Sequence, residues 1–370
     1  MIFFMGFKIT NDLKGFVELK PMISQQSLTP RISDLFQGLF TQNKNILQKY
    51  ISHPHIAWTG SGREALRQIL LQLDGENVAV PGYTCHVVLD AIERAGKKPV
   101  FYDSSVIADV KDIEKIILKV GTLIVSYNFG FMPNVEKIIQ ICKKHNVILI
   151  EDCAQSLGAK YNEKLVGSFG DYAFYSFGIS KNIGFCGGLI TSKNKLRLQK
   201  TREMPFFYFL DTIVKSSVHS FFFHPFLYKY TKKYLQEELE KIHPPLAYKL
   251  PAYAKNVILH QCKRYNKILK RRQRNAMYCI RELEGAIDFV NPLENSNPSW
   301  LYFVIKTNHT QHLIKKLVKE GIELGEMHTF QALSSDLPKS LDVENKILTF
   351  SLYRKFSEIK KIVKSIKNIT

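Results

Sequence analysis

The sequence predicts an α/β protein, in which a large domain with a mainly parallel central sheet flanked by helices precedes a small C-terminal α+β domain. Two observations carry this prediction. Between residues 58 and 192, short apolar runs alternate with helical patterns, and such alternation requires crossover connections between parallel strands. After residue 298, a strand pattern is followed by helical patterns. The chain has 370 residues, which is long enough to bury both cores.

The elements are expected in the following order. A helix near residues 32–47 belongs to a polar and aromatic lead-in. Strands are expected at residues 78–80, 99–102, 123–126, 147–150, 172–176 and 188–191. Helices alternate with them at 64–73, 87–95, 112–119 and 135–144, and Gly96 ends the second of these. A long basic helix at 253–283 precedes a strand at 301–305 and helices at 311–320 and 358–366.

This rhythm divides the chain into a lead-in at 1–55, a large α/β domain at 56–203, an aromatic-rich insert at 204–250, and a long helix with the small α+β domain at 251–370. Within the insert, residues 204–230 hold ten Phe or Tyr residues. Apolar surface most often serves protein contacts, so burial against a second subunit or the long helix is favoured. Aromatic residues flanked by lysines also suit peripheral contact with an anionic membrane, which stays an alternative.

The overall charge and the cysteines narrow the class of protein. A formal net charge of +19 is compatible with nucleic acid, an anionic membrane surface or phosphorylated substrates. No nucleic-acid recognition motif accompanies the charge, so no nucleic-acid partner is expected. The six cysteines show neither a CxxC pair nor metal-ligand spacing. Because the sequence also lacks a signal-peptide pattern and an apolar run of about 18 residues, a cytoplasmic protein without a bound metal is expected.

Three turns carry residues suited to chemistry. In the first, glycines precede a helix start whose N–H groups can hold a phosphate, and Arg63 can add charge. In the second, Asp152 closes a strand that is expected to be buried, where a carboxylate needs a partner. In the third, Lys181 lies in a Gly-, Ser- and Phe-rich segment that favours Schiff-base chemistry. Taken singly, each turn also has a simpler reading, as an N-cap, a strand-end cap or an exposed loop lysine.

Together, the three turns match the needs of pyridoxal phosphate (PLP), namely a phosphate cradle, a carboxylate for the ring nitrogen and a Schiff-base lysine. The matching strings are SGREAL, VPGYTCHVVLDAIERAGKKPVFYD, IEDCAQSLGA, VGSFGDYAFYSFGISKNIG and GGLITS. Through them the chain resembles the DegT/DnrJ/EryC1/StrS family of PLP-dependent sugar aminotransferases, which have the PLP-dependent transferase fold type I. The resemblance continues more loosely in LYFVIKT, KEGIELGE and ILTFSLYRKFSEIKKIV.

The resemblance implies a role for individual residues. It implies that Lys181 is the Schiff-base lysine and Asp152 the partner of the protonated ring nitrogen, so these two are the expected catalytic residues. The other implied cofactor-binding residues are Gly62 and Arg63 in the phosphate cradle, Ser176 as a phosphate ligand, Gln155 near the phenolic oxygen, Ala154 against one ring face, and Cys85 or His86 at the ring-covering position.

The chain departs from the family pattern in several places. Cys85 and His86 stand where the family often has an aromatic residue that stacks on the ring. Tyr127, in SYNFG, replaces the histidine of the family's V-H-x-x-G motif. The glycine-rich turn after Lys181 is one residue short. Finally, the aromatic insert replaces the segment that commonly sends an asparagine to the partner subunit's phosphate. The departures concern the substrate side of the pocket more than the cofactor side.

The resemblance implies an aminotransferase that moves an amino group from glutamate or glutamine to a nucleotide-linked keto-sugar, in glycan or secondary-metabolite biosynthesis. It also implies a homodimer with the site near the subunit boundary. Two alternatives stay open. A PLP-dependent sugar dehydratase of the same family has histidine where this chain has Lys181. A catalytically silent binding or assembly protein has no need to keep both Asp152 and Lys181.

Overall fold

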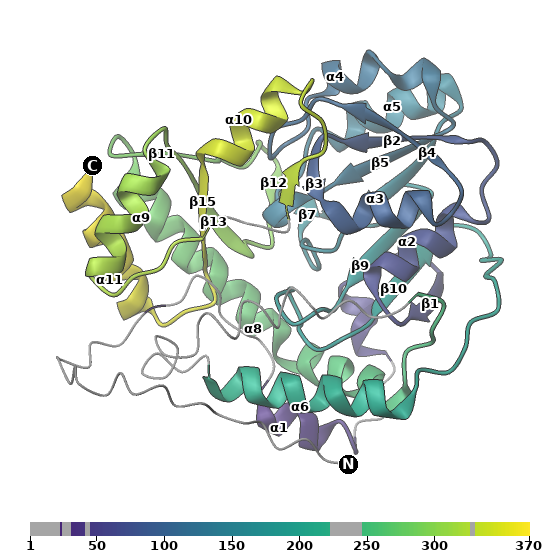
Figure 1. Ribbon diagram of the computed structural model, residues 1–370, viewed down its shortest axis with the longest axis horizontal. Helices are drawn as coiled ribbons and strands as arrows, with labels where there is room; N and C mark the ends of the chain where they lie inside the picture. The colour runs from purple at the N-terminus through teal and green to yellow at the C-terminus, as the bar shows by residue number, and fades with distance from the viewer. Residues whose placement is uncertain (1–22, 24–30, 41–44, 223–245, 326–329) are drawn as a thin grey trace.

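A computed structural model describes residues 23, 31–40, 45–222, 246–325 and 330–370 (Figure 1). Its centre is a seven-stranded sheet in the order β1-β10-β9-β6-β5-β2-β4. The five strands from β9 to β4 are parallel, and β10 runs antiparallel to both β9 and β1. The bounds are β1 (His55–Thr59), β2 (Asn77–Pro81), β4 (Lys98–Tyr102), β5 (Thr122–Ser126), β6 (Ile148–Asp152), β9 (Tyr172–Ser176) and β10 (Gly188–Ser192). The mainly parallel sheet predicted from the sequence is confirmed.

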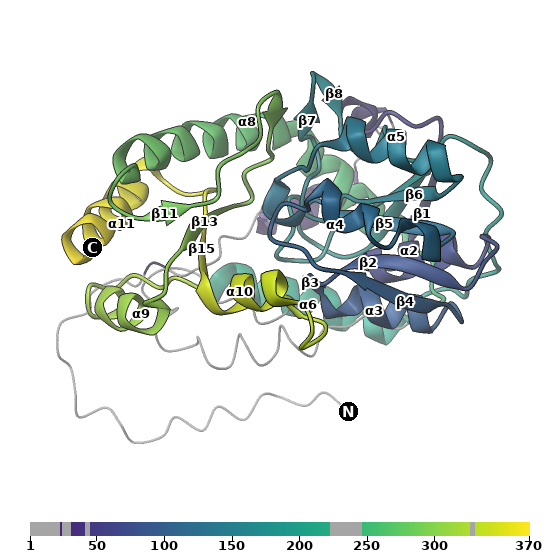
Figure 2. The ribbon, with the colours of Figure 1, turned by 90° about the horizontal axis from the view of Figure 1, so that it is seen from above.

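Helices cover both faces of this sheet (Figure 2). Along each strand, successive side chains point to opposite faces of the sheet and so enter two different apolar cores. Ile124 and Ile150 belong to one apolar core, and Leu123 and Leu149 belong to the other. With both faces buried, the middle residues of the central strands β2 and β5 and the first three residues of β6 are apolar. The first core contains residues of α2 (Gly62–Leu70) and α3 (His86–Glu93), and the second contains residues of α4 (Val110–Glu114) and α5 (Val135–His145).

The C-terminal part has its own core around a three-stranded antiparallel sheet in the order β11-β13-β15. Its strands are β11 (Asp288–Phe289), β13 (Tyr302–Lys306) and β15 (Ile347–Ser351). Its helices are α9 (Thr310–Lys319), α10 (Pro338–Lys346) and α11 (Phe356–Ile369). The long helix α8 (Ala252–Leu283) contributes its first half to the large core and its second half to this small core. α8 therefore connects the two parts of the molecule.

Two small strand pairings bring distant segments to the edges of the large domain. β14 (Phe330–Ala332) pairs antiparallel with β3 (Tyr83–Cys85). β12 (Ser296–Asn297) pairs with β7 (Lys160–Tyr161), which also pairs with β8 (Lys164–Leu165). The first pairing matters for function because it places a C-terminal segment beside the turn that holds Cys85.

The helix predicted at 32–47 is wrong. The segment contains the short helix α1 (Ile32–Gln37) and, separately, a 3-10 turn at Ile46–Lys49. Gly38 ends α1 at a point where a Cβ atom would collide with the side chain of Val257 on α8. The close packing of α1 on α8 therefore requires glycine at this position.

The helix predicted at 112–119 is also wrong in its extent. It is divided into α4 and a separate 3-10 turn at Ile117–Lys119. The segment contains Ile113, Ile116 and Ile117, and β-branched side chains lower helix propensity. The tighter turn buries Ile117 against the large core.

The aromatic insert begins with α6 (Phe206–Phe222), which lies beside α1 (Figure 1). Phe209 packs against Tyr253 at the start of α8, with 5.7 Å between the ring centroids. Phe206 and Phe207 are instead 69% and 82% exposed. Packing against the long helix, which the sequence favours together with burial against a second subunit, therefore buries part of α6. The aromatic residues at 223–230 lie outside the described residues.

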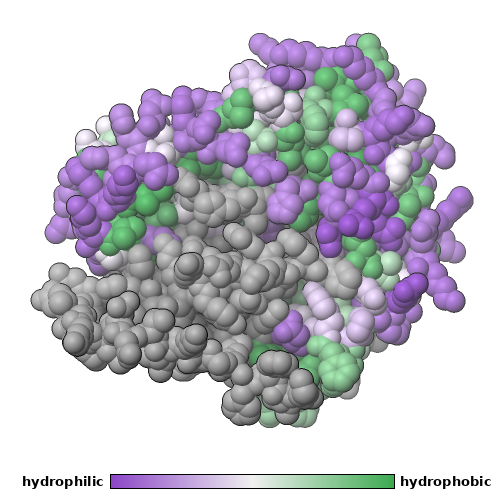
Figure 3. Space-filling view, viewed as in Figure 1, coloured by the Kyte–Doolittle hydropathy of each residue, from purple (hydrophilic) through white to green (hydrophobic). Residues whose placement is uncertain are grey.

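The surface of the described residues is mainly hydrophilic on the face seen in Figure 3. Apolar residues also appear on that face at its lower edge, where α6 and α1 lie. Among the described residues, no helix combines the length and the apolarity that a membrane span requires.

Candidate active site

The residues predicted for the site meet at the edge of the sheet where the parallel strands end, the usual ligand position in such sheets. Asp152 is the last residue of β6, Ser176 is the last residue of β9, and Lys181 lies in the turn that follows β9. Gly62 opens α2, and a Cβ atom on it would lie only 2.7 Å from Cβ of Ser176. Segments far apart in the sequence therefore form one small region.

Asp152 is a buried carboxylate with two hydrogen-bond donors. Ser126 Oγ donates to Oδ2 over 3.1 Å, and the backbone N–H of Ala154 donates to Oδ1 over 3.0 Å. Burial raises the pKa of Asp152 above its ordinary value, and the hydrogen bonds and the positive charge of Lys181 act in the opposite direction. A cation placed against this carboxylate would offset the cost of its burial.

Lys181 is half-buried in the turn between β9 and β10. Its backbone N–H donates to the carbonyl oxygen of Gly178 over 2.9 Å. Its Nζ lies 6.0 Å from the centroid of the Phe330 ring, which belongs to β14. The amine thus has an apolar ring on one side and lies within electrostatic range of Asp152.

The start of α2 has the geometry of a phosphate cradle. Ser61 caps the helix, because its Oγ accepts a hydrogen bond from the N–H of Glu64 over 3.1 Å. The earliest N–H groups of a helix have no acceptor within the helix, and the helix dipole favours an anion beside them. The Arg63 guanidinium donates to Asp90 Oδ2 over 2.7 Å, which directs it to a carboxylate that Arg94 also contacts. Arg63 therefore suits the cradle through its backbone rather than its side chain.

Glycines at the end of the lysine turn allow close approach to this cradle. Gly187 has a φ of 105°, a conformation that residues with a Cβ rarely adopt. A Cβ atom on Gly188 would collide with the carbonyl group of Ser61. Gly187 is therefore required by its backbone conformation, and Gly188, the first residue of β10, is required by the close contact of its backbone with that of Ser61.

Gln155 lies in the turn that follows Asp152 and is 4% exposed. Its Oε1 accepts a hydrogen bond from the backbone N–H of Phe129 over 2.5 Å. Phe129 has a φ of 58°, which is uncommon for a bulky residue, so this hydrogen bond stabilises a strained turn beside the site. Ala154, which directly precedes Gln155, is half-buried.

Cys85 and His86 occupy the junction of β3 and α3. Burial raises the pKa of the Cys85 thiol, and the charges of Lys181 and Asp152 also act on it. Cys85 therefore lies among the site groups. His86 is half-buried at the start of α3. In the strand pairing, Cys85 is the register partner of Phe330, whose ring lies 6.0 Å from the Lys181 amine.

Sequence reasoning missed three residues around the site, namely Thr84, Ser126 and Phe330. Ser126 is the last residue of β5, so the rule that ligands gather at strand carboxyl ends would have identified it. Thr84 Oγ1 lies 3.4 Å from Ser126 Oγ and extends the hydrogen-bonded group around Asp152. Phe330 had no comparable signal, because only the pairing of β14 with β3 brings it to the site.

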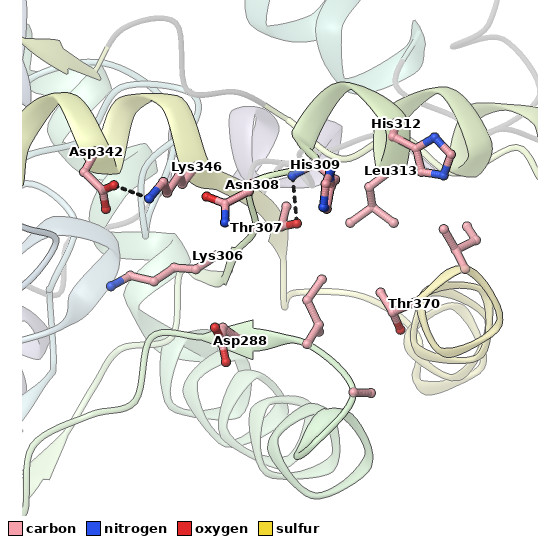
Figure 4. A pocket seen from close by; sticks show the side chains of 13 residues that line it. Asp288, Lys306, Thr307, Asn308, His309, His312, Leu313, Asp342, Lys346 and Thr370 are labelled. Carbon is pink, nitrogen blue, oxygen red and sulfur yellow. Dashed lines mark hydrogen bonds and ion pairs between the residues drawn. The ribbon is translucent and has the colours of Figure 1, made fainter.

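A separate cavity of about 840 Å³ lies in the small domain (Figure 4). Residues of β11, β13, α9, α10 and α11 line it. In its wall Lys346 pairs with Asp342, and the N–H of His309 donates to Thr307 Oγ1 over 3.1 Å. None of the residues predicted for the cofactor site lines this cavity, so it is distinct from the candidate active site.

The residues present fit PLP. The phosphate of PLP is an anion, and the start of α2 beside Ser176 offers backbone donors and a hydroxyl group. The ring nitrogen becomes a cation when protonated, and Asp152 is a buried carboxylate that a cation would complete. The aldehyde reacts with an amine, and Lys181 supplies one within electrostatic range of Asp152. Three different groups of one molecule thus match three neighbouring features of the protein.

The fold and this set of residues define a class, the PLP-dependent transferases of fold type I. The profile of the DegT/DnrJ/EryC1/StrS aminotransferase family matches residues 41–359, and the chain belongs to this family. The predicted family, the predicted fold class and PLP as the cofactor of the family are therefore confirmed.

Three known proteins illustrate the similarity. The chain is 34% identical over 193 residues to GDP-perosamine synthase of Escherichia coli O157:H7, which covers 47% of the chain and 53% of that protein. It is 31% identical over 198 residues to a pleiotropic regulatory protein of Geobacillus stearothermophilus, with 48% and 53% covered. The PLP form of the putative sugar aminotransferase Spr1654 of Streptococcus pneumoniae has a TM-score of 0.71 at 17% identity, with 95% and 98% covered. The chain spans about half the length of the curated relatives it matches.

Proposed function

We propose that the protein is a PLP-dependent aminotransferase that moves an amino group from glutamate or glutamine to a nucleotide-linked keto-sugar. The observation that carries the proposal is the convergence of Asp152, Lys181 and the contact of Gly62 with Ser176 at one edge of the sheet. Membership of an aminotransferase family supports the reaction class.

Each residue of the site has a defined task in this proposal. When bound, the cofactor supplies an electron sink for bond breaking at the carbon that carries the amino group. The first turn of α2 and Ser176 hold its phosphate, and Asp152 keeps its ring nitrogen protonated. Ser126 and Ala154 orient that carboxylate through their hydrogen bonds. Lys181 holds the cofactor at rest and, as a free amine, accepts and returns a proton during the transfer.

The apolar side of the site excludes water. The Phe330 ring lies beside the Lys181 amine, and the Cys85 thiol is drawn into the same region by the pairing of β3 with β14. A low-dielectric wall strengthens the attraction between Asp152 and a cationic ring. The wall comes from the C-terminal part of the chain, so the small domain completes the site.

The proposed sugar substrate rests on two supports. The relative in Escherichia coli O157:H7 is named for the synthesis of GDP-perosamine, a sugar linked to a nucleotide. The net charge of +19 also favours an anionic substrate, because positive surface potential raises the local concentration of a nucleotide diphosphate.

The presence of Lys181 separates this proposal from its alternatives. A sugar dehydratase of the same family has histidine at this position, and the chain has lysine. A silent binding or assembly protein predicts a colourless purified protein that glutamate does not change. An aminotransferase predicts a yellow protein whose absorption band is lost when glutamate donates its amino group.

The substitution Lys181→Ala tests the assignment. We expect the variant to lose the visible absorption band, and to yield no borohydride-fixed cofactor on the peptide around residue 181 by mass spectrometry. Lys195→Ala is the matched control, because Lys195 is an exposed lysine that follows β10. A Lys181→Ala protein that still fixes the cofactor would refute the site.

The donor and the acceptor are tested separately. Glutamate and glutamine are each added to the purified enzyme, and the loss of the visible band is followed in a single turnover. Nucleotide-linked keto-sugars are then screened for restoration of that band. Free keto-sugars serve as the control, since restoration by them alone would contradict the nucleotide-linked substrate.

We also propose a homodimer that covers the exposed aromatic residues of α6, of α1 and of the turn that follows α1. Phe36, Phe40, Phe206 and Phe207 are all more than half exposed, which is unusual for neighbouring residues of a monomer. We expect the wild type to sediment as a dimer at micromolar concentration, and the double variant Phe206→Ser/Phe207→Ser to sediment as a monomer. Leu118→Ser removes an equally exposed apolar residue elsewhere and serves as the control. A wild-type monomer that binds anionic vesicles would favour the membrane alternative.

A further inference from the structure

The long helix α8 carries an unusual line of buried polar side chains. Gln261, Tyr265, Arg272 and Asn275 are each 0% exposed. Their spacings of four, seven and three residues place them on one face of the helix. A helix face that packs against a core is normally apolar, so each of these groups requires a partner inside the protein.

Arg272 is the most unusual member of this line. Its terminal nitrogen donates to Asn182 Oδ1 over 2.9 Å. Nε and the other terminal nitrogen are buried without a hydrogen-bond acceptor, and no carboxylate lies within ion-pair distance among the described residues. Burial lowers the pKa of Arg272, and Tyr265, Tyr302 and Tyr353 oppose this effect. A guanidinium buried without a carboxylate is costly, so stability alone does not explain it.

Asn182, which accepts this hydrogen bond from Arg272, directly follows Lys181. Asn182 Nδ2 in turn donates to Ser299 Oγ over 3.4 Å, and Ser299 Oγ donates to the carbonyl oxygen of Gln155 over 2.8 Å. All four residues are buried. A continuous path of hydrogen bonds therefore joins α8 to the lysine turn and to the turn that follows Asp152.

α8 holds the lysine turn at a second point. Gln261 Nε2 donates to the carbonyl oxygen of Gly184 over 2.8 Å. One turn of helix beyond Arg272, Asn275 Nδ2 donates to the carbonyl oxygens of Leu352 and Arg354 over 2.9 and 3.2 Å. The same helix face thus holds the turn that contains Lys181 and the loop after β15 in the small domain (Figures 1 and 2).

We propose that Arg272 is a positioning residue that acts through Asn182 to hold the backbone of the Lys181 turn, and this rests on the proposed role of Lys181. Arg272 does not reach the reacting atoms. Its effect is to fix where the Lys181 amine stands relative to Asp152, because Asn182 cannot move without breaking a buried hydrogen bond. A misplaced reacting group costs on the order of 100-fold in rate.

Two roles of Arg272 make opposite predictions for Arg272→Met. If Arg272 only stabilises the fold, the variant unfolds more easily and the activity of its folded fraction is normal. If Arg272 positions Lys181, the folded protein itself is impaired, even where loss of the hydrogen bond to Asn182 Oδ1 also lowers its stability. In that case kcat falls by about 10- to 100-fold, with KM for the donor changing much less.

The experiment compares Arg272→Met, Asn182→Ala and the double variant with Arg271→Met, a neighbouring arginine that is exposed and also lies over the Tyr353 ring. Four quantities are measured on the purified proteins. These are kcat and KM, the pH dependence of the visible band of the holoenzyme, the thermal midpoint without cofactor, and the rate of reductive methylation of Lys181 without cofactor by mass spectrometry.

We expect Arg272→Met and Asn182→Ala each to lower kcat, to shift the pH dependence of the band and to change the methylation rate. The double variant should be no worse than the poorer single variant, because both substitutions break the same path. Arg271→Met should behave as wild type. Additive losses of kcat in the double variant would overturn the proposal. Wild-type kinetics in Asn182→Ala would also overturn it, and this test applies even if Arg272→Met fails to fold. Failure of the site itself is distinguished by Lys181→Ala, which would then retain the fixed cofactor.

Discussion

Two neighbouring carboxylates on β6, Glu151 and Asp152, have opposite surroundings although both are buried. Side chains alternate along a strand, so the two point to opposite faces of the sheet. Glu151 lies 0% exposed within the core that contains Leu149 and Tyr127. Asp152 points to the other face, at the edge where Lys181 and the start of α2 meet.

Glu151 has a complete set of hydrogen-bond donors. The Tyr127 hydroxyl donates to Oε2 over 2.8 Å, and the backbone N–H of Gly167 donates to the same oxygen over 2.7 Å. The N–H groups of Phe169 and Gly170 donate to Oε1 over 2.8 and 2.6 Å. Burial raises the pKa of Glu151, and these four hydrogen bonds oppose the effect. Glu151 is therefore the anchor of the loop at 167–170.

The difference teaches how to separate a structural carboxylate from a functional one. Among the described residues, two donors reach Asp152, although an ionised carboxylate has about four acceptor positions. Its remaining capacity faces the region of Lys181. A buried carboxylate with hydrogen-bond donors for all its acceptor positions stabilises the fold. A buried carboxylate with acceptor positions left open can bind a ligand.

The largest expected effect is on activity and comes from Asp152→Asn. An amide cannot keep the ring nitrogen protonated, so we expect kcat to fall by about 100- to 1,000-fold, as for other lost electrostatic contacts in active sites. Single-turnover reaction with glutamate measures the loss. The thermal midpoint of the cofactor-free variant should be equal to or above that of the wild type. A large drop in that midpoint would make Asp152 a structural residue like Glu151.

Glu151→Gln should show the reverse pattern. The amide NH₂ cannot accept a hydrogen bond, so at least one buried donor of Tyr127, Gly167, Phe169 or Gly170 loses its partner. We expect a loss of about 1–3 kcal/mol in the free energy of unfolding. Chemical denaturation measures it, with Asp152→Asn as the control. Normal stability with lost activity would contradict the division between the two carboxylates.

A smaller effect is expected for Tyr127→Phe. It removes one of the four donors of Glu151 and leaves the three backbone N–H groups in place. The expected cost is about 1 kcal/mol of unfolding free energy, with kcat within about twofold of the wild type. Tyr127 stands where the family's V-H-x-x-G motif has histidine. A strong loss of kcat would therefore show that the residue at this position takes part in the reaction.

The smallest effect concerns pH and the cofactor-free protein. Burial raises the pKa of Asp152, so the folded state binds this proton more tightly than the unfolded chain. The resulting stabilisation is present at acidic pH, below the unfolded pKa, and is lost as pH rises through the folded pKa. Relative to Asp152→Asn, the wild type should therefore become less stable from acidic to neutral pH. Thermal unfolding of both proteins across this range measures the difference, and an opposite slope would contradict the assigned environment.

Much of the fold could be predicted from the sequence because its strands and helices carry local patterns. The strand predicted at 172–176 coincides with β9 (Tyr172–Ser176), since an apolar run with clear flanks defines it. The helix predicted at 253–283 is close to α8 (Ala252–Leu283). Prediction failed at 32–47, where α1 ends at Gln37 and the next residue, Gly38, approaches Val257 too closely for a Cβ atom.

The sequence by itself determined the family, the parallel sheet and the candidate residues Asp152 and Lys181, because each depends on residues that are close together along the chain. Only the tertiary structure decided that Phe330 lies beside the Lys181 amine, that Arg63 pairs with Asp90, and that Arg272 donates to Asn182. These contacts join residues that are distant in sequence, and a buried hydrogen bond or ion pair leaves no periodic pattern from which its partner could be read.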